Sequence, residues 1–213
     1  MLDNRPAGSA WLLALPAMVG TAAGLLMLPS ALKLPFYRRT QLDGVVTIDD
    51  AVAACQRTSL QGWELVGYAQ QLVCRKFAYY STRNLWDTPA RAFAHGMGYC
   101  TQYNLALKQI LDRLGFETEA VFSLRVRVLD DPSWTMGHTW LRVTVDGETR
   151  DVCAGRAGNA PGRVHFMPLA PVLHGNDAIF LLTHLGMIPF CGFVEWKGIV
   201  VDRQEPGWTF RAR

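Results

Sequence analysis

Residues 98–104, with the sequence GYCTQYN, begin the stretch that decides the fold of this chain. Apolar side chains recur after Cys100 at the spacing of one helical face, which predicts a helix from Cys100 to Leu114 with Gly115 as its C-terminal cap. The Cys100 thiol would then lie at the N-terminal end of this helix, beside unpaired backbone N–H groups and the positive end of the helix dipole. Both features lower the pKa of a thiol, and the same N–H groups could bind an oxyanion. Cys100 is therefore the candidate nucleophile.

Strand patterns follow the predicted helix. Alternating apolar and polar residues predict strands over 120–128 and 138–145. Asp146-Gly147 predicts a tight turn into a third strand over 148–153. The expected fold class is therefore α+β, with the helix that begins at Cys100 packed on an antiparallel sheet.

His138 and Asp151 lie on the second and third predicted strands and complete a candidate catalytic set with Cys100. A histidine can take the proton of a thiol, and a carboxylate can fix the tautomer and orientation of the histidine. Trp140 shares the strand face of His138, where it could shield the imidazole from water. His95 is a rival base, but it lies in a glycine-rich stretch that would orient it poorly.

Aromatic residues near the cysteine and the histidine are the candidates for a substrate pocket or an oxyanion hole. Tyr99 directly precedes the nucleophile, Trp140 follows the histidine, and Trp63 and Trp86 lie upstream. The N–H of Cys100 is the first natural oxyanion donor. Core packing is the alternative role for the two upstream tryptophans.

The segment from Gly98 to about Leu169 resembles the core of the transglutaminase-like superfamily, whose members share a papain-like arrangement of a cysteine helix on a sheet. The resemblance rests on the Gly-x-Cys helix start, on Leu114-Gly115-Phe116 and on Gly137-His138-Thr139-Trp140. The arylamine N-acetyltransferases, a branch with the same core, are a second match through Tyr99-Cys100 with Asn104 and through Asp151-Val152 followed by Gly155. The resemblance implies a papain-like core with Cys–His–Asp catalysis. In true transglutaminases a tryptophan indole also assists the oxyanion.

The spacing between the histidine and the acid departs from this family pattern. The two residues usually lie about fifteen positions apart across the hairpin, whereas His138 and Asp151 are thirteen apart. A two-residue turn would place Arg142 opposite Asp151 and Trp140 opposite Cys153. Asp151 would then lie roughly 13 Å from His138, too far for a hydrogen bond. A wider turn or a bulge would close the gap, and otherwise Asp151 pairs with Arg142.

The first 33 residues differ from the rest of the chain, which is expected to form one domain over 34–213. Residues 6–32 carry no charged side chain, and residues 10–28 are apolar over about the length of a membrane-spanning helix. We therefore predict an apolar N-terminal helix that contacts a membrane and anchors the domain. The basic residues that follow it favour a cytoplasmic location for the domain. The alternative is a buried helical hairpin broken at Pro16 and Pro29.

Composition excludes several other classes of function. The net charge is +3 without a basic cluster, so no nucleic-acid partner is expected. The five cysteines lack CxxC spacing, which favours free thiols in a reducing compartment. The sequence shows neither a glycine-rich phosphate motif nor metal-ligand spacing, so no cofactor and no metal is expected. A zinc site built from Cys100, His138 and Cys153 has no motif behind it.

The expected function is thiol-dependent acyl transfer or hydrolysis on a peptide or small amide substrate, through an acyl-enzyme at Cys100. Two alternatives stay open. One is a non-catalytic binding module that retains the fold. The other is acetyl transfer of the arylamine N-acetyltransferase type, which is disfavoured because that branch normally carries a longer helical region before the cysteine.

Overall fold

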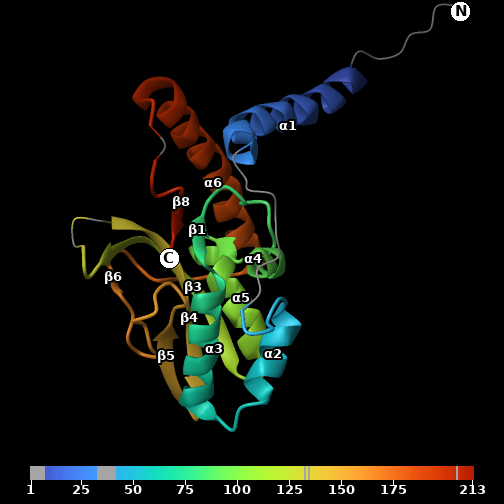
Figure 1. Cartoon of the computed structure of the whole chain (residues 1–213). Helices are drawn as coiled ribbons and strands as arrows, with labels where there is room; N and C mark the ends of the chain where they lie inside the picture. The colour runs from blue at the N-terminus through green and yellow to red at the C-terminus, as the bar shows by residue number, and fades with distance from the viewer. Residues whose placement is uncertain (1–7, 33–41, 132, 134, 205) are drawn as a thin grey trace, which may run out of the picture.

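The computed structural model describes residues 8–32, 42–131, 133, 135–204 and 206–213 (Figure 1). Its helices are α1 (Gly8–Leu32), α2 (Ile48–Gln56), α3 (Gly62–Lys76), α4 (Pro89–His95), α5 (Cys100–Arg113) and α6 (Asp177–Lys197), and a π-helical turn (Gly198–Asp202) continues α6. Its strands are β1 (Tyr79–Ser81), β2 (Met97–Gly98), β3 (Glu117–Val128), β4 (Thr135–Val145), β5 (Glu148–Val152), β6 (Phe166–Pro168), β7 (Leu173–His174) and β8 (Phe210–Ala212). The predicted boundary between the N-terminal segment and the domain, at 33–34, lies outside the described residues.

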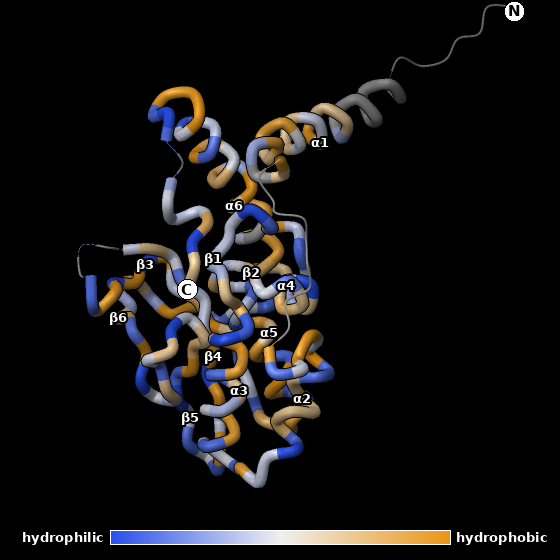
Figure 2. Tube along the Cα trace, viewed as in Figure 1, coloured by the Kyte–Doolittle hydropathy of each residue, from blue (hydrophilic) through white to orange (hydrophobic). Residues whose placement is uncertain are grey.

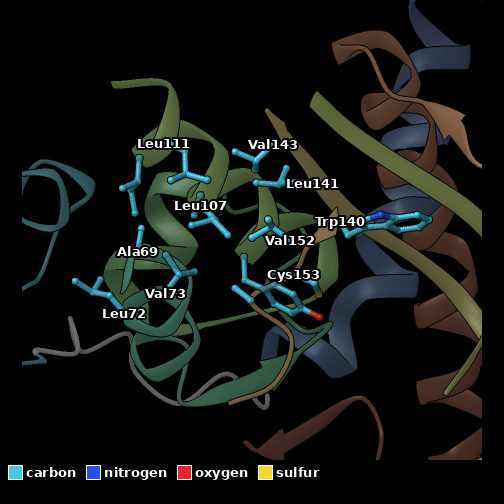
Figure 3. Packing of buried hydrophobic residues seen from close by; sticks show 14 of the residues in the cluster. Ala69, Leu72, Val73, Leu107, Leu111, Trp140, Leu141, Val143, Val152 and Cys153 are labelled. Atoms are coloured by element: carbon cyan, nitrogen blue, oxygen red, sulfur yellow. The ribbon is translucent and has the colours of Figure 1, made fainter. Parts of the chain in front are cut away.

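A five-stranded antiparallel sheet forms the centre of the fold, with strand order β5-β4-β3-β6 and with β7 paired to β3. Helix α5 packs on this sheet, and Figure 3 shows Leu107 and Leu111 of α5 beside Leu141 and Val143 of β4. All four side chains are fully buried. Strands β2, β1 and β8 form a second, three-stranded sheet. The predicted α+β fold class, with a helix on an antiparallel sheet and an apolar helix before it, is confirmed.

The helix predicted from Cys100 to Leu114 is α5. Its last helical residue is Arg113, and Leu114 is its C-cap. Gly115 follows with a φ of +87°, a conformation that would strain a residue with a side chain. The predicted C-terminal glycine is therefore required by the backbone at this position.

The hairpin between β4 and β5 has the two-residue turn that the sequence predicts. Asp146 and Gly147 have φ values of 50° and 80°, and the register continues without interruption to Arg142 opposite Asp151. A register shift occurs instead in the pairing of β3 with β4. The β4–β5 pairing therefore contains no bulge that would move Asp151 towards His138.

Helices α1 and α6 pack against each other at one end of the molecule, away from α2 and β5 (Figure 1). Gly192 of α6 permits a close approach, because a Cβ there would lie 2.7 Å from the carbonyl oxygen of Leu26. The Nε1–H of Trp196 also donates a hydrogen bond of 3.0 Å to the carbonyl of Leu25. We call these two helices the α1–α6 pair, and apolar residues recur along both (Figure 2). The apolar N-terminal helix was predicted, whereas its apolar partner α6 was not.

The segment Ala178–Asp202 is, among the described residues, the helical segment long and apolar enough to cross a membrane. Its mean hydropathy is 1.6, and 24% of its apolar window is buried. A helix that forms the core of a globular protein would be mostly buried, so α6 differs from such a helix. Residues Pro16–Pro29 of α1 form a shorter apolar helix.

Candidate active site

Cys100 is the first residue of α5, and a buried amide fixes the chain around it. The Nε2 of Gln102 donates to the carbonyl oxygens of Asn84 and Asp87, both at 2.9 Å. The Oε1 of the same side chain accepts from the N–H of Tyr99 at 3.2 Å. The side chain of Gln102 therefore ties the backbone at the start of α5, where Cys100 lies, to the segment that contains Asn84 and Asp87.

Cys100 and His138 border a common cavity of about 700 Å³, which we call the apolar cavity. Its walls come from β3, β4, α6 and neighbouring residues, and they include Phe122, Met187 and Phe190. The structure therefore brings the predicted nucleophile and the predicted base into one site, although they lie 38 positions apart in the sequence.

A second cavity, of about 660 Å³, borders the same two residues from another side. Its lining includes the cationic side chains of Arg156 and Arg213 as well as the imidazole of His165, and we call it the polar cavity. Cys100 and His138 thus lie between an apolar and a polar compartment.

The imidazole of His138 is buried among aromatic rings. Trp140 is nearly parallel to it, with ring centroids 6.3 Å apart, and Phe166 lies edge-on at 4.5 Å. The Nε2 atom lies 3.3 Å from the sulfur of Cys153, and the buried Nδ1 has no hydrogen-bond partner among the described residues. Burial lowers the pKa of His138 to about 3, and His165 adds to this shift. The imidazole is therefore neutral at pH 7.

The carboxylate of Asp151 contacts Trp140 and Arg142 rather than the His138 imidazole. Its Oδ1 accepts from the Nε1–H of Trp140 at 2.9 Å and lies 3.5 Å from Nε of Arg142. The tight turn is the physical reason, because it pairs Asp151 with Arg142, farther along β4 than His138. The prediction that Asp151 orients His138 directly is thus corrected. Asp151 instead fixes the indole that stacks on the imidazole.

Cys153, and not the predicted Asp151, occupies the position at which the family pattern has its acid. It is fifteen residues after His138, the separation that transglutaminase-like domains usually have between histidine and acid. Buried amides of Gln70 and Asn159 donate to its carbonyl oxygen at 3.1 and 2.9 Å, and the N–H of Gly155 lies 3.3 Å from its sulfur. Burial raises the pKa of the Cys153 thiol to about 12. A neutral thiol, held in place by its backbone, therefore faces Nε2.

A thiol orients a histidine less strictly than a carboxylate does. An ionised carboxylate only accepts hydrogen bonds, so it holds the ring proton on Nε2 and leaves Nδ1 available as a base. The Cys153 thiol is both a weak donor and a weak acceptor, so it can pair with either tautomer of His138. It also supplies no negative charge to stabilise an imidazolium.

The electrostatics of Cys100 differ from the prediction made for a helix start. Burial raises the pKa of the thiol, and hydrogen bonds from the backbone of Thr139 and from Thr101 offset only part of this effect. The expected lowering by the helix N-terminus is thus outweighed by desolvation. At pH 7 the resting site contains a neutral thiol and a neutral imidazole rather than an ion pair.

The remaining predicted pocket residues lie in different places. Tyr99 is buried and borders the apolar cavity beside Cys100. Trp63 lies against the guanidinium of Arg150, with 4.4 Å between the guanidinium carbon and the ring centroid, and Trp86 is 43% exposed. Neither tryptophan is among the described residues that line the two cavities. The backbone N–H of Cys100 therefore remains the candidate oxyanion donor.

Asn104 and His165 have roles that the sequence analysis did not assign. The Nδ2 of Asn104 donates to the carbonyl of Thr139 at 2.6 Å, and its Oδ1 accepts from the N–H of Ala154 at 3.0 Å. One buried amide thereby joins β4 to the segment after β5. The ring of His165 lies 5.9 Å from the ring of His138 and borders the polar cavity. The available signal for Asn104 was its place on the buried face of α5, one helical turn after the cysteine.

The sequence also offers His95 as a rival base, and a zinc site at Cys100, His138 and Cys153 that has no motif behind it. His95 ends α4, and its Nδ1 lies 2.9 Å from a carboxylate oxygen of the buried Asp87. Within the described ranges, no group of three His, Cys, Asp or Glu side chains is placed to hold a metal ion.

The α+β fold, with a helix that begins at a cysteine packed on an antiparallel sheet, is consistent with a papain-like fold. Residues 94–161 match the family model described as N-acetyltransferase. This part of the chain contains α5, β3, β4 and β5, and it includes Cys100, His138 and Cys153. It covers about a third of the chain, and a search of curated proteins found no match. The match supports cysteine-dependent acyl transfer, and it falls on the branch that the sequence analysis placed second.

Proposed function

We propose that this protein is a cysteine-dependent acyltransferase that passes an acyl group from an ester or thioester to a primary amine. The observation that carries the proposal is the position of Cys100 at the N-terminal end of α5, with His138 on the same cavity. The match of residues 94–161 to the N-acetyltransferase model favours an amine as acceptor over hydrolysis of a peptide amide, which the sequence suggested first.

The proposed transfer has two steps that use the same two side chains. In the first step His138 takes the Cys100 proton, the sulfur–carbon bond forms, and the leaving group departs with that proton. In the second step the amine attacks the thioester, the carbon–nitrogen bond forms as the sulfur–carbon bond breaks, and a proton returns through His138 to Cys100. Backbone N–H groups at the start of α5 can stabilise the oxyanion in both steps.

The ring nitrogen that carries these protons is assigned to Nδ1, because Nε2 already contacts Cys153. Both reacting groups are neutral in the resting site, so the proton must move as the sulfur attacks. The resulting imidazolium lacks a carboxylate partner. We therefore expect slower acylation than in a site where an acid supports the histidine.

Intact-mass measurement of acylation tests this proposal. The full-length protein is mixed with an acetyl thioester of a small thiol, and an acetyl adduct is expected at Cys100. The adduct should be absent in Cys100→Ala and form at least about a hundredfold more slowly in His138→Ala. Cys55→Ala, a control that removes another free thiol outside both cavities, should acylate normally. A primary amine should release the acetyl group faster than water does.

A second candidate function is a non-catalytic binding module that retains the fold. The observation in its favour is that a neutral thiol, rather than a carboxylate, faces Nε2 of His138. This candidate predicts that no acyl adduct forms. It also predicts that alkylation of Cys100 is unaffected by His138→Ala, which would rule out the acyltransferase.

A further inference from the structure

The apolar cavity joins the candidate nucleophile to the α1–α6 pair. Thr183, Gly186, Met187 and Phe190 of α6 line it at helical spacing, and Cys100 lies in the wall formed by α5. Its volume of about 700 Å³ lies within the range of sites that bury drug-sized ligands. A small acetyl group would leave most of this apolar volume unfilled.

The rim of the apolar cavity is itself exposed and apolar. Phe190 on α6 is 53% exposed and Leu124 on β3 is 70% exposed, and both side chains line the cavity. Large apolar side chains at the mouth of a cavity gain stability when they contact an apolar surface outside the protein. The cavity is therefore suited to a ligand that arrives from an apolar phase.

The outer surface of the α1–α6 pair is apolar over many residues. Among the side chains that the structure describes, nine large apolar ones on α6 and the π-helical turn are exposed, and five on α1. The exposed side chains on α6 include Leu182 and Phe193, at 67% and 64%. Monomeric soluble proteins rarely expose contiguous apolar surface on this scale, whereas helices that lie in a bilayer do.

Two cationic side chains lie close to the thiol. Arg213 borders the polar cavity and Arg211 borders both cavities, which meet at Cys100 and His138. Guanidinium groups recognise phosphate, because their N–H donors match its oxygens in geometry and charge. The site thus combines an apolar compartment, a nucleophile and two nearby guanidinium groups.

We propose that the acyl donor is a membrane glycerophospholipid, with one acyl chain in the apolar cavity, its ester carbonyl at Cys100 and its phosphate towards Arg211 and Arg213. The α1–α6 pair lies in the bilayer from which the donor is drawn. This inference rests on the proposed acyltransferase function and names its donor. It extends the membrane contact predicted for residues 10–28 to α6.

The donor step follows the general mechanism. The Cys100 sulfur forms a bond to the ester carbonyl carbon, and the carbon–oxygen bond to glycerol breaks. The Cys100 proton passes through His138 to that oxygen, so a lysophospholipid leaves. A primary amine then takes the acyl group as an amide, and its displaced proton restores the Cys100 thiol.

Protection of Cys100 from alkylation tests the chain-binding part without requiring catalysis. The full-length protein is held in vesicles of ether-linked phosphatidylcholine, which has no acyl ester to donate. Hexadecanoic acid should slow alkylation at least tenfold, and acetic acid should not. Gly186→Leu should abolish this protection, because Gly186 lines the cavity with open space around its Cβ. Gly20→Leu, at an equally open helical glycine outside the cavity, is the matched control and should keep it.

Equal protection in Gly186→Leu, or none in the wild type, would overturn the chain-binding part. Chemistry is measured separately by adding dihexadecanoyl phosphatidylglycerol to the same vesicles. A hexadecanoyl adduct is expected on the wild type and not on Cys100→Ala. Protection with no adduct from this lipid, while the acetyl thioester still acylates Cys100, would overturn the lipid donor. Protection with no adduct from either donor would overturn the proposed acyltransferase and keep the chain site.

Flotation with the same vesicles tests the membrane surface. The full-length protein should float with them, and Leu182→Glu and Phe193→Glu should each weaken binding about tenfold, because each removes apolar burial and adds a charge. Tyr68→Glu, at an exposed aromatic residue on α3, is the control and should float like the wild type. A wild-type protein that stays in solution, or equal losses in all three variants, would overturn the membrane contact.

Discussion

Buried amide side chains hold the region around Cys100, whereas the α1–α6 pair is held mainly by apolar contacts and a close helix approach. Gln102 alone makes three hydrogen bonds to the backbone near the active site. At the other end, Trp196 bonds to the backbone of Leu25, and many of the surrounding apolar side chains remain exposed. The backbone groups that Gln102 binds find their partner within the chain, whereas the α1–α6 pair leaves apolar surface exposed for a partner. This contrast separates a rigid chemical centre from a surface built for contact.

The largest effect on stability is expected from Gln102→Leu. The substitution keeps the approximate volume but leaves two carbonyl oxygens and one N–H without their buried partner. Each such group costs about 1–3 kcal/mol, so we expect the free energy of unfolding to fall by about 3–5 kcal/mol. Urea denaturation measures this change.

Leu185→Ala on α6 is the comparison for this variant. Leu185 is 51% exposed, so its truncation should change the free energy of unfolding by less than about 0.5 kcal/mol. Similar losses in the two variants would show that both regions depend on packing to the same degree, and the contrast would not hold.

Cys153→Asp should produce the next largest effect, on reactivity. A carboxylate beside Nε2 raises the pKa of His138, because it favours the imidazolium. Cys100 should then be alkylated about ten- to a hundredfold faster at pH 7, a gain of about 1.4–2.7 kcal/mol in favour of the ion pair. The measurement is the rate of alkylation as a function of pH.

Cys153→Ser is the matched control because it keeps the size and adds no charge. It should leave the alkylation rate within a factor of a few of the wild type. An equal increase in the alkylation rate of Cys100 in both variants would mean that the Cys153 thiol itself slows the reaction. The charge of the new carboxylate would then not be the cause.

The smallest expected effect is the pH dependence of stability that His138 causes. Its pKa is about 3 in the folded protein and about 6.5 when unfolded, so the unfolded state binds the extra proton between these values. Stability therefore falls as the pH decreases through this window. Between pH 6.5 and 5.5 the wild type should lose about 1 kcal/mol more than His138→Gln does. Equal losses in paired urea titrations would place the imidazole in contact with water.

The part of the fold that follows Cys100 could be predicted because its signals are local. The helical stripe of α5 and the alternation in β3 and β4 each depend on neighbours within a few residues. The turn residues Asp146 and Gly147 fix the register of the hairpin, and from that register the pairing of Asp151 with Arg142 followed.

The rest of the site depends on contacts that local patterns do not encode. Cys153 lies just beyond the last residue of β5, so its approach to His138 depends on how the chain leaves the sheet. The separation of fifteen residues was readable, but a cysteine at that position suggests core packing rather than a partner for a base. The pKa of Cys100 was predicted in the wrong direction because burial cannot be read from a helix start alone.

Helix α6 was not predicted as an exposed element for a related reason. Its composition is that of a buried helix, and sequence does not distinguish a helix covered by protein from one covered by another apolar phase. The exposed fractions of Leu182 and Phe193 supply this distinction, and they exist only once the rest of the fold is placed.

The contact between α1 and α6 also has a consequence for how the chain is made. Trp196 and the carbonyl of Leu25 are 171 residues apart. At translation rates of about 5–20 residues per second, α1 leaves the ribosome roughly 10–30 s before its partner exists. During that interval its apolar surface must be sheltered by something else, and a bilayer or a chaperone can do so. The synthesis of α6 thus determines when α1 finds this neighbour.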